Sequence, residues 1–288
     1  MQAGAATLGD VMAGARTVLE TAGIPSDEAA VDVDLYARRI LGWDRARVLT
    51  SRAEPPPAAL EPTFSTWIAR RAQREPSAYI IGHREFYGRD FDVSPAVLIP
   101  RPETEHIIDA ALPLLAERPG ALVADLGTGS GNIAVTLACE ASSCQVLATD
   151  VSAEALAVAR RNAARHGVGT RVTFVHTSYL DGVENTFDLI AANPPYVREG
   201  DRAGLSPSVR REPAVALFGG EDGLRGIESV LDATVARLTP RGWLLMEFGF
   251  GQEDAVRAAV ARRPALRLDR TIADLQGLPR TVVVQRLG

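Results

Sequence analysis

The feature that most narrows the possible folds is an apolar run, Phe-Asp-Leu-Ile-Ala-Ala at residues 187–192, which ends in Asn193-Pro194-Pro195-Tyr196. A short apolar run bounded by turn residues is typical of a buried parallel strand. Pro194 and Pro195 have no N–H to continue a strand ladder, and each fixes φ near about −65°. Asn193 precedes a proline and is therefore expected to be extended. The pattern predicts a stiff corner at the carboxyl end of a strand, the edge at which open α/β sheets bind ligands.

Strands and helices alternate from residue 121 onward, which predicts a doubly wound α/β domain with seven strands. The last two strands follow each other without a helical segment, so one of them is expected to be antiparallel. The predicted strands cover 121–126, 145–149, 171–175, 187–192, 241–248, 265–271 and 281–287. The predicted helices between them cover 131–141, 153–166, 223–238 and 252–263.

The first 80 residues have helical periodicity and predict a small helical domain at 1–80. Apolar residues from Leu8 to Leu19 share one helix face, and Gly23-Ile24-Pro25 ends that helix. Residues 81–102 then alternate in polarity around Gly88-Arg89, which predicts a β-hairpin linker. The remaining residues, 103–288, form the predicted α/β domain.

Charge and composition narrow the class of protein. The 288 residues carry a formal net charge of −5, which argues against direct nucleic-acid binding. Residues 37–89 hold ten arginines against five acids, which fits either solvated helix faces or a docking surface for an acidic partner. Neither a signal peptide nor an apolar membrane span is evident. We therefore expect a cytoplasmic protein with no membrane partner. A monomer is a separate expectation, because the sequence carries no signal of oligomeric state.

A glycine-rich turn follows the first predicted strand, at residues 125–131 (Asp-Leu-Gly-Thr-Gly-Ser-Gly). Its glycines permit a tight turn and let a ligand approach the backbone at a helix N-terminus. Because residue 132 is asparagine, the spacing departs from the G-x-G-x-x-G fingerprint of dinucleotide-binding sites. Asp125 would repel a pyrophosphate, but it suits a cationic amino acid head group, directly or through water.

Two further positions complete a predicted donor site. Asp150 ends the second strand, where a carboxylate can accept both ribose hydroxyls of an adenosine. Tyr179 follows the third strand and can flank an adenine. An acid, a glycine turn and a second acid in this order predict binding of S-adenosylmethionine. The predicted cofactor-binding residues are Asp125, Gly127, Thr128, Gly129, Ser130, Gly131, Asp150, Tyr179 and Asn193.

With the donor over the glycine turn, the Asn-Pro-Pro-Tyr corner predicts methylation of a planar NH₂ group. The Asn193 side-chain oxygen and the Pro194 carbonyl can each accept a hydrogen bond from that group, and Tyr196 can stack on it. We therefore assign Asn193, Pro194 and Tyr196 as catalytic. No general base is expected in the transition state, because the product nitrogen is acidic enough to lose its proton to water afterwards. No metal ion is expected either, because a sulfonium is a sufficient leaving group. An amide and an adenine both fit this description.

A rigid charged loop, Ile99-Pro100-Arg101-Pro102-Glu103-Thr104-Glu105, precedes the α/β domain. Glu103 and Glu105 suit the first turn of a helix. The loop fits two interpretations equally well from its own residues, a simple connector and a stiff substrate gate.

Taken together, these motifs resemble the PrmC/HemK family of protein-(glutamine-N5) methyltransferases, whose members have a class I S-adenosylmethionine-dependent domain. The resemblance covers nearly the whole chain and includes 84–88 (Arg-Glu-Phe-Tyr-Gly) and 211–217 (Arg-Glu-Pro-Ala-Val-Ala-Leu). It implies that the substrates are class I peptide-chain release factors, methylated at the glutamine of their Gly-Gly-Gln motif. It also implies that the helical domain helps to dock the factor. The expected substrate-binding residues are Asn193, Pro194, Pro195, Tyr196, Arg101 and Glu103.

Other functions remain open from the sequence alone. The Asn-Pro-Pro-Tyr motif is shared with adenine-N6 methyltransferases of nucleic acid, although the loop at 101–105 favours the glutamine enzymes. An N5-glutamine methyltransferase of a different translation protein is a further alternative. A non-catalytic binding module and a dinucleotide oxidoreductase fit less well. Ser178 stands where relatives often carry an acid near the adenine, so the contact at Tyr179 is the least constrained of the donor contacts.

Overall fold

The computed structural model describes residues 6–288, so residues 1–5 of the predicted helical domain lie outside the described part. The chain forms two compact units. One comprises the helical region up to Gly82 together with the short segment Pro207–Arg211, and the other comprises His83–Ser206 and Glu212–Gly288. The hairpin that we predicted as a linker is therefore part of the second unit. Within the described residues, no helix is long and apolar enough to span a bilayer.

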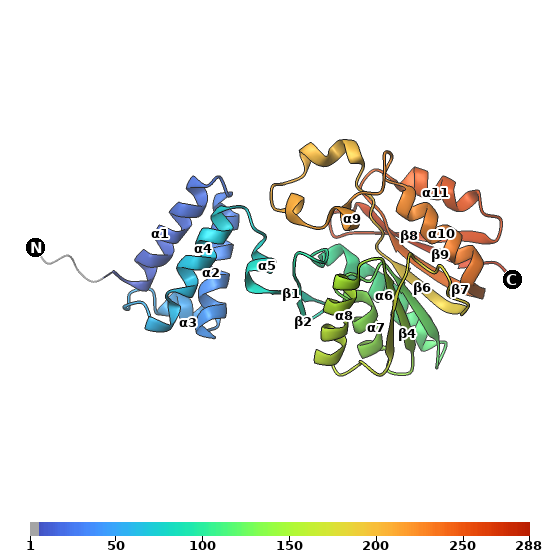
Figure 1. Cartoon of the computed structure of the whole chain (residues 1–288), viewed down its shortest axis with the longest axis horizontal. Helices are drawn as coiled ribbons and strands as arrows, with labels where there is room; N and C mark the ends of the chain where they lie inside the picture. Colours follow the sequence, from blue (N-terminus) through green and yellow to red (C-terminus); the bar gives the residue numbers. More distant parts are fainter. Residues whose placement is uncertain (1–5) are drawn as a thin grey trace, which may run out of the picture. The chain divides into compact units, whose positions relative to one another are not determined.

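The helical unit begins with a well-capped helix, because the Thr7 hydroxyl accepts from the Asp10 N–H and the Asp10 carboxylate accepts from the Thr7 N–H. Two short helices, α3 and α5, were not predicted from the sequence, since neither is long enough to show a helical period. The elements are α1 (Leu8–Thr21), α2 (Ser26–Leu41), α3 (Arg45–Thr50), the 3₁₀ turn η1 (Ala58–Leu60), α4 (Thr63–Ala72) and α5 (Ser77–Ile81), coloured blue to cyan in Figure 1.

A buried ion pair holds three helices of this unit together. Arg71 on α4 donates from Nε to Asp32 on α2 at 2.6 Å, and its Nη2 bonds Glu28. Ser77 at the start of α5 donates to the other oxygen of Asp32 and also contacts the Tyr36 hydroxyl. Arg71 and Asp32 are only 3% and 5% exposed, so this network lies within the core of the unit.

The hairpin consists of β1 (His83–Phe86) and β2 (Arg89–Asp92). Tyr87 and Gly88 form its turn with φ of 52° and 71°, the two positive values that a type I′ turn requires. Glu105 accepts from the Tyr87 N–H at 2.8 Å, which ties the turn to the start of α6 (Glu105–Ala116). The 3₁₀ turn η2 (Pro102–Thr104) leads directly into that helix.

The second unit contains a sheet of seven strands within the described chain, with spatial order β5-β4-β3-β6-β7-β9-β8. β9 is antiparallel to both of its neighbours, as predicted, and the other pairs are parallel. The predicted doubly wound α/β class, a Rossmann-like fold, is therefore confirmed. The strands are β3 (Leu122–Leu126), β4 (Gln145–Asp150), β5 (Val172–His176), β6 (Phe187–Ala192), β7 (Leu238–Glu247), β8 (Leu266–Ala273) and β9 (Pro279–Arg286).

Helices cover both faces of the sheet (Figure 1). Alternate residues of each strand point to opposite faces, so Val123 packs with α6 and α7, whereas Ala124 packs with α10 and α11. The helices and turns that follow β3 in the sequence are α7 (Asn132–Glu140), α8 (Ala153–Arg165), η3 (Glu199–Gly204), η4 (Val209–Arg211), α9 (Ala214–Leu217), α10 (Arg225–Arg237) and α11 (Glu253–Ala261).

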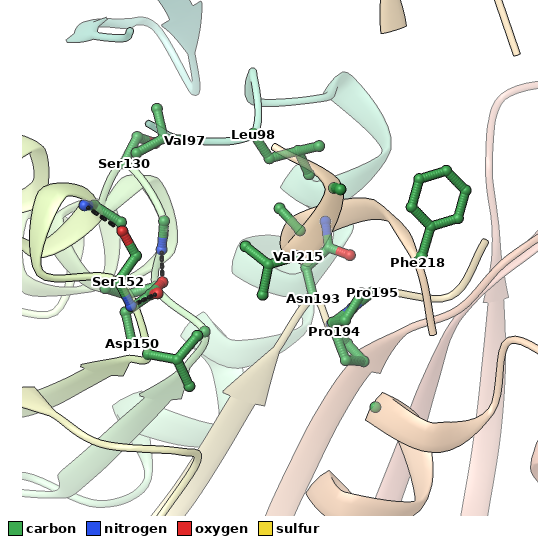
Figure 2. Close-up of a pocket in the computed structure, with 18 of the residues that line it drawn as sticks. Val97, Leu98, Ser130, Asp150, Ser152, Asn193, Pro194, Pro195, Val215 and Phe218 are labelled. Atoms are coloured by element: carbon green, nitrogen blue, oxygen red, sulfur yellow. Dashed lines mark hydrogen bonds between the residues drawn. The ribbon is translucent and has the colours of Figure 1, made fainter. Parts of the chain in front are cut away.

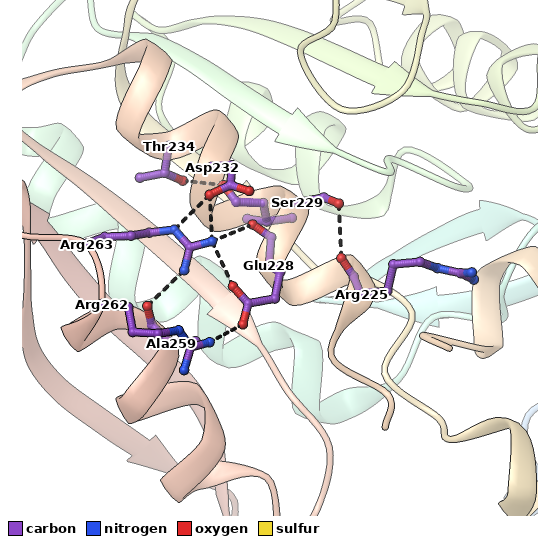
Figure 3. A network of polar contacts seen from close by, with 9 residues as sticks. Arg225, Glu228, Ser229, Asp232, Thr234, Ala259, Arg262 and Arg263 are labelled. Atoms are coloured by element: carbon purple, nitrogen blue, oxygen red, sulfur yellow. Dashed lines mark hydrogen bonds and ion pairs between the residues drawn. The ribbon is translucent and has the colours of Figure 1, made fainter. Parts of the chain in front are cut away.

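A polar network fixes α10 against the end of α11 (Figure 3). Arg263 donates to Glu228 at 2.7 Å and to Asp232 at 2.6 Å, and Arg262 also bonds Glu228. The first residue of α10, Arg225, reaches the pocket described below. The network therefore helps to place the helix that carries this pocket residue.

The register of the sheet aligns the carboxyl ends of four adjacent strands. Leu126 pairs with Thr149 on one side and with Ala192 on the other, and Ala192 pairs with Met246. The residues that come next along each strand, Asp150, Gly127, Asn193 and Glu247, consequently form one row. The row crosses the gap between β3 and β6, where the chain reverses its winding direction and where such sheets bind ligands.

Candidate active site

A pocket of about 460 Å³ opens along this row. Figure 2 shows Ser130, Asp150 and Ser152 on one side and Asn193, Pro194 and Val215 across from them. Its lining also includes the β2–η2 connection and the segment around α9. Of the predicted site residues, those that line the pocket are Arg101, Gly127, Thr128, Gly129, Ser130, Asp150, Tyr179, Asn193, Pro194 and Pro195.

The glycine turn adopts a backbone that only glycine tolerates well. Gly127, Gly129 and Gly131 have φ of 73°, 54° and 80°. A Cβ at Gly131 would lie 3.0 Å from Ala159 Cβ on α8, so this glycine allows close helix packing. A Cβ at Gly127 or Gly129 would meet nothing within 4 Å, and both glycines line the pocket. The turn therefore presents bare backbone to a ligand.

Asp150 anchors the turn and remains able to bind a diol. Its Oδ2 accepts from the Gly129 N–H and its Oδ1 from the Ser152 N–H, both at 2.9 Å. A carboxylate has about four acceptor positions, so each oxygen keeps one for a ligand hydroxyl. Partial burial raises the pKa of Asp150.

Asp125 lies beneath the turn and does not line the pocket. Its Oδ2 accepts from the Thr128 hydroxyl at 2.5 Å and from the Ala134 N–H at 3.1 Å, which ties the turn to α7. Within the described structure, its Oδ1 is buried without a hydrogen-bond partner. Burial raises the pKa of Asp125 to about 7. This carboxylate shapes the turn, and a direct contact with a head group is not part of the geometry.

Asn162 on α8 was not predicted as a site residue. Its carboxamide exchanges two hydrogen bonds with the Asp92 backbone, at 2.8 and 3.0 Å, and its Nδ2 also donates to the Ser130 carbonyl at 2.8 Å. The side chain is fully buried. It therefore links the glycine turn to strand β2 of the hairpin.

Asn193 is held by a chain of three polar side chains. Its Nδ2 donates to the Thr104 hydroxyl at 3.1 Å, and that hydroxyl donates to Glu247 Oε2 at 2.6 Å. The Tyr196 hydroxyl donates to Glu247 Oε1 at 3.0 Å. Glu247 is 1% exposed, and burial raises its pKa. Neither Thr104 nor Glu247 was predicted as a site residue.

Tyr196 differs from its prediction, because it does not line the pocket. Its ring packs against the core on the α10 side of the sheet. Burial raises the pKa of Tyr196 above its ordinary value, so the phenol keeps its proton and donates to Glu247. Stacking on the acceptor, which we expected of this ring, has no support in the geometry.

Three glycines pack against the backbone of the Asn193–Tyr196 segment, which we call the proline corner. A Cβ at Gly219 would lie 2.4 Å from the Pro195 carbonyl oxygen, and one at Gly226 would lie 2.8 Å from the same atom. A Cβ at Gly223 would lie 2.3 Å from the Tyr196 carbonyl oxygen. No side chain fits at these contacts, so the segment leading into α10 packs directly on the corner.

The charged loop is fixed by a carboxylate 111 residues away in the sequence. Arg101 donates to Glu212 Oε1 at 2.5 Å, and Glu212 Oε2 accepts from the Ile99 N–H at 3.0 Å. Glu212 is 5% exposed. Arg101 lines the pocket, whereas Glu103 does not. The loop therefore forms one side of the pocket, and Glu212 fixes its conformation.

The fold and the site together define a class I S-adenosylmethionine-dependent methyltransferase. The bare glycine turn, the available oxygens of Asp150 and the position of Tyr179 fit the amino acid, ribose and adenine parts of that cofactor. The chain matches the methyltransferase small domain family over residues 107–206 and the PrmC N-terminal domain family over residues 10–82.

Similar proteins narrow the class further. The release factor glutamine methyltransferase of Koribacter versatilis is 42% identical, with 92% of this chain and 93% of that protein covered. The protein of the same name from Neisseria gonorrhoeae is 40% identical, with 88% and 92% covered. This chain belongs to the release factor glutamine methyltransferase family. The hMettl16 catalytic domain, solved in complex with MAT2A 3′UTR hairpin 1, shares only the fold, with 15% identity, a TM-score of 0.58, and 83% and 85% covered.

Proposed function

We propose that this chain transfers a methyl group to the side-chain amide nitrogen of the glutamine in the Gly-Gly-Gln motif of class I release factors. The observation that carries the proposal is the hydrogen bond from Asn193 Nδ2 to Thr104, which turns the nitrogen toward Thr104 and leaves Oδ1 as the acceptor of a carboxamide that lines the pocket. With the Pro194 carbonyl, it provides two acceptors for one planar NH₂ group. Family membership favours a glutamine over an adenine as the owner of that group.

The two acceptors address the main obstacle in the reaction. An amide nitrogen is a poor nucleophile because its lone pair is delocalised into the carbonyl group. Hydrogen bonds from both of its N–H groups to Asn193 and Pro194 fix the nitrogen and stabilise the positive charge that develops on it. S-adenosylmethionine supplies the electrophilic methyl group on a sulfonium. As the N–C bond forms and the C–S bond breaks, the alkylated nitrogen becomes acidic and loses its proton to water.

Two further residues of the pocket lining can contact an incoming peptide. Arg101, which is held by Glu212, and the apolar Val215 both line the pocket. Val215 is 60% exposed, which fits a residue that is covered only when substrate binds. We also expect the enzyme to act in the cytoplasm as a monomer, and sedimentation of the purified chain tests its oligomeric state.

Methyl transfer from labelled donor to a cognate release factor tests the proposal. We expect a gain of one methyl group, located by mass spectrometry on the glutamine of Gly-Gly-Gln. A release factor with that glutamine changed to alanine is the matched control and should stay unlabelled. Label on an adenine-containing oligonucleotide, with none on the folded factor, would support the nucleic-acid alternative and overturn the proposal.

A further inference from the structure

A polar chain through Thr104 and Glu247, neither of which was predicted as a site residue, connects the end of β7 to Asn193. We propose that Thr104 and Glu247 are positioning residues, which set the orientation of the Asn193 carboxamide so that its oxygen, and not its nitrogen, is presented to the substrate. This positioning role matters for catalysis only if the proposed function holds. The hydrogen bonds that support it are all made between residues of this chain.

Both oxygens of Glu247 accept hydrogen bonds from hydroxyl groups. The Thr104 hydroxyl donates its single hydrogen to Oε2 at 2.6 Å. Tyr196 likewise gives its hydrogen to Oε1. The lone pairs of Thr104 Oγ1 then face Asn193 and require a donor.

Only one end of the Asn193 carboxamide can meet that requirement. Nδ2 is a donor and lies 3.1 Å from Thr104 Oγ1. If the carboxamide were flipped, Oδ1 would face the lone pairs of Thr104, and two acceptors would oppose each other at a partly buried contact. Thr104 itself is 1% exposed, which limits the water that can compensate such a pairing. The chain of hydrogen bonds therefore selects one of the two orientations.

The selected orientation is the one that the reaction needs. A flipped Asn193 would present N–H groups to the N–H groups of the substrate amide, and neither could accept. Thr104 and Glu247 never touch the substrate nitrogen in this scheme; they act through Asn193. The carboxylate is well placed for this task because Glu247 follows Met246, which pairs with Ala192 directly before Asn193.

The test compares Thr104→Val, which keeps the shape and removes the hydroxyl, with Thr104→Ser, which keeps the hydroxyl. We expect Thr104→Val to lower kcat roughly 10- to 100-fold while the donor Kd stays within about twofold of wild type. Thr104→Ser should restore kcat to within about threefold of wild type. A wild-type kcat in Thr104→Val, or an equal loss in Thr104→Ser, would overturn the proposal.

Thr281→Val is the matched control. Thr281 lies on β9 opposite Glu247, is fully buried, and its hydroxyl has no hydrogen-bond partner in the described part of the chain. The same chemical change there should leave kcat unaltered. If Thr104→Val does not fold, as judged by its thermal unfolding, Thr104→Ala removes the hydroxyl without adding bulk at the same position.

A second readout does not depend on activity. The side-chain NH₂ signal of Asn193, identified by its absence in Asn193→Asp, should exchange slowly with solvent in wild type and rapidly in Thr104→Val. Rapid exchange in wild type would overturn the positioning role even if the factor is methylated. Slow exchange in a wild-type enzyme that does not methylate the factor would instead leave the positioning role standing and remove the proposed function.

Discussion

At the scale of single residues, Asp125 makes the stability of the enzyme depend on pH. Burial raises its pKa from 3.8 to about 7 in the folded chain, so the folded state holds a proton that the unfolded state releases. The stabilisation from this proton is fully present below about pH 3.8 and is lost as the pH rises through about 7. The burial of an ionised carboxylate therefore weakens the donor-free enzyme at neutral pH.

We predict that Asp125→Asn removes this dependence. The free energy of unfolding of the wild type, relative to Asp125→Asn, should fall by roughly 4 kcal/mol between pH 4 and pH 8. Urea unfolding of both proteins across that range measures the difference. Parallel curves for the two proteins would mean that Asp125 is ionised throughout and that its buried charge is compensated.

At the scale of elements, the first turn of α10 packs directly on the proline corner because residue 226 is glycine. Gly226→Ala favours the helix by about 1 kcal/mol in propensity, but its Cβ would lie 2.8 Å from the Pro195 carbonyl oxygen. Because that neighbour is backbone, the corner or the helix must shift. We predict that kcat falls at least about tenfold, since a small displacement of Asn193 disturbs the alignment with the donor. Steady-state kinetics with saturating donor measure this.

Gly14→Ala is the control for this prediction. Gly14 lies in the exposed part of α1, and a Cβ there would meet nothing within 4 Å. The substitution should stabilise the helical unit by about 0.5–1 kcal/mol and leave kcat unchanged. Wild-type kcat in Gly226→Ala would show that the corner tolerates displacement and that its close packing on α10 does not control the reaction.

At the scale of the whole molecule, the two units have separate cores, and the helical unit depends on a buried ion pair. Arg71→Met would leave Asp32 charged and unpaired in the interior, which we predict to cost roughly 3–5 kcal/mol. Calorimetry should show an earlier unfolding transition for the helical unit, while donor affinity at lower temperature stays at the wild-type value.

An exposed pair in the same unit provides the comparison. Arg16 contacts Glu20 at 2.8 Å, with side chains 47% and 37% exposed. Arg16→Met should therefore change stability by less than about 1 kcal/mol. If both substitutions changed the free energy of unfolding by a similar amount, the buried Arg71 network would contribute no more to stability than an exposed ion pair.

Much of the architecture was predictable from the sequence because it is encoded locally. The order of strands and helices after residue 121 follows from the spacing of apolar residues, and the antiparallel β9 follows from the missing helix before it. The glycine turn and the Asn-Pro-Pro-Tyr corner carry their own turn chemistry. These two motifs also had to meet, because parallel strands bring their carboxyl ends to one edge.

The supporting residues were not predictable, because their partners lie far away in the chain. Glu247 is 143 residues from Thr104, and Glu212 is 113 residues from Ile99. Nothing in the sequence around Glu247 or Glu212 distinguishes it from a surface acid, because its partner is brought close only by the fold. The hydrogen bond from Tyr196 to Glu247 was missed for the same reason, since the two residues are 51 positions apart in the chain.

The role of Asn193 as an acceptor for the substrate amide is tested most sharply by Asn193→Ala, assayed for donor binding and for methyl transfer in parallel. Calorimetry should give a donor Kd within about twofold of wild type, because the glycine turn and Asp150 hold the donor. Transfer to the release factor should fall at least about a hundredfold, because one of the two acceptors for the amide nitrogen is gone. A variant that binds the donor and methylates at the wild-type rate would contradict this role.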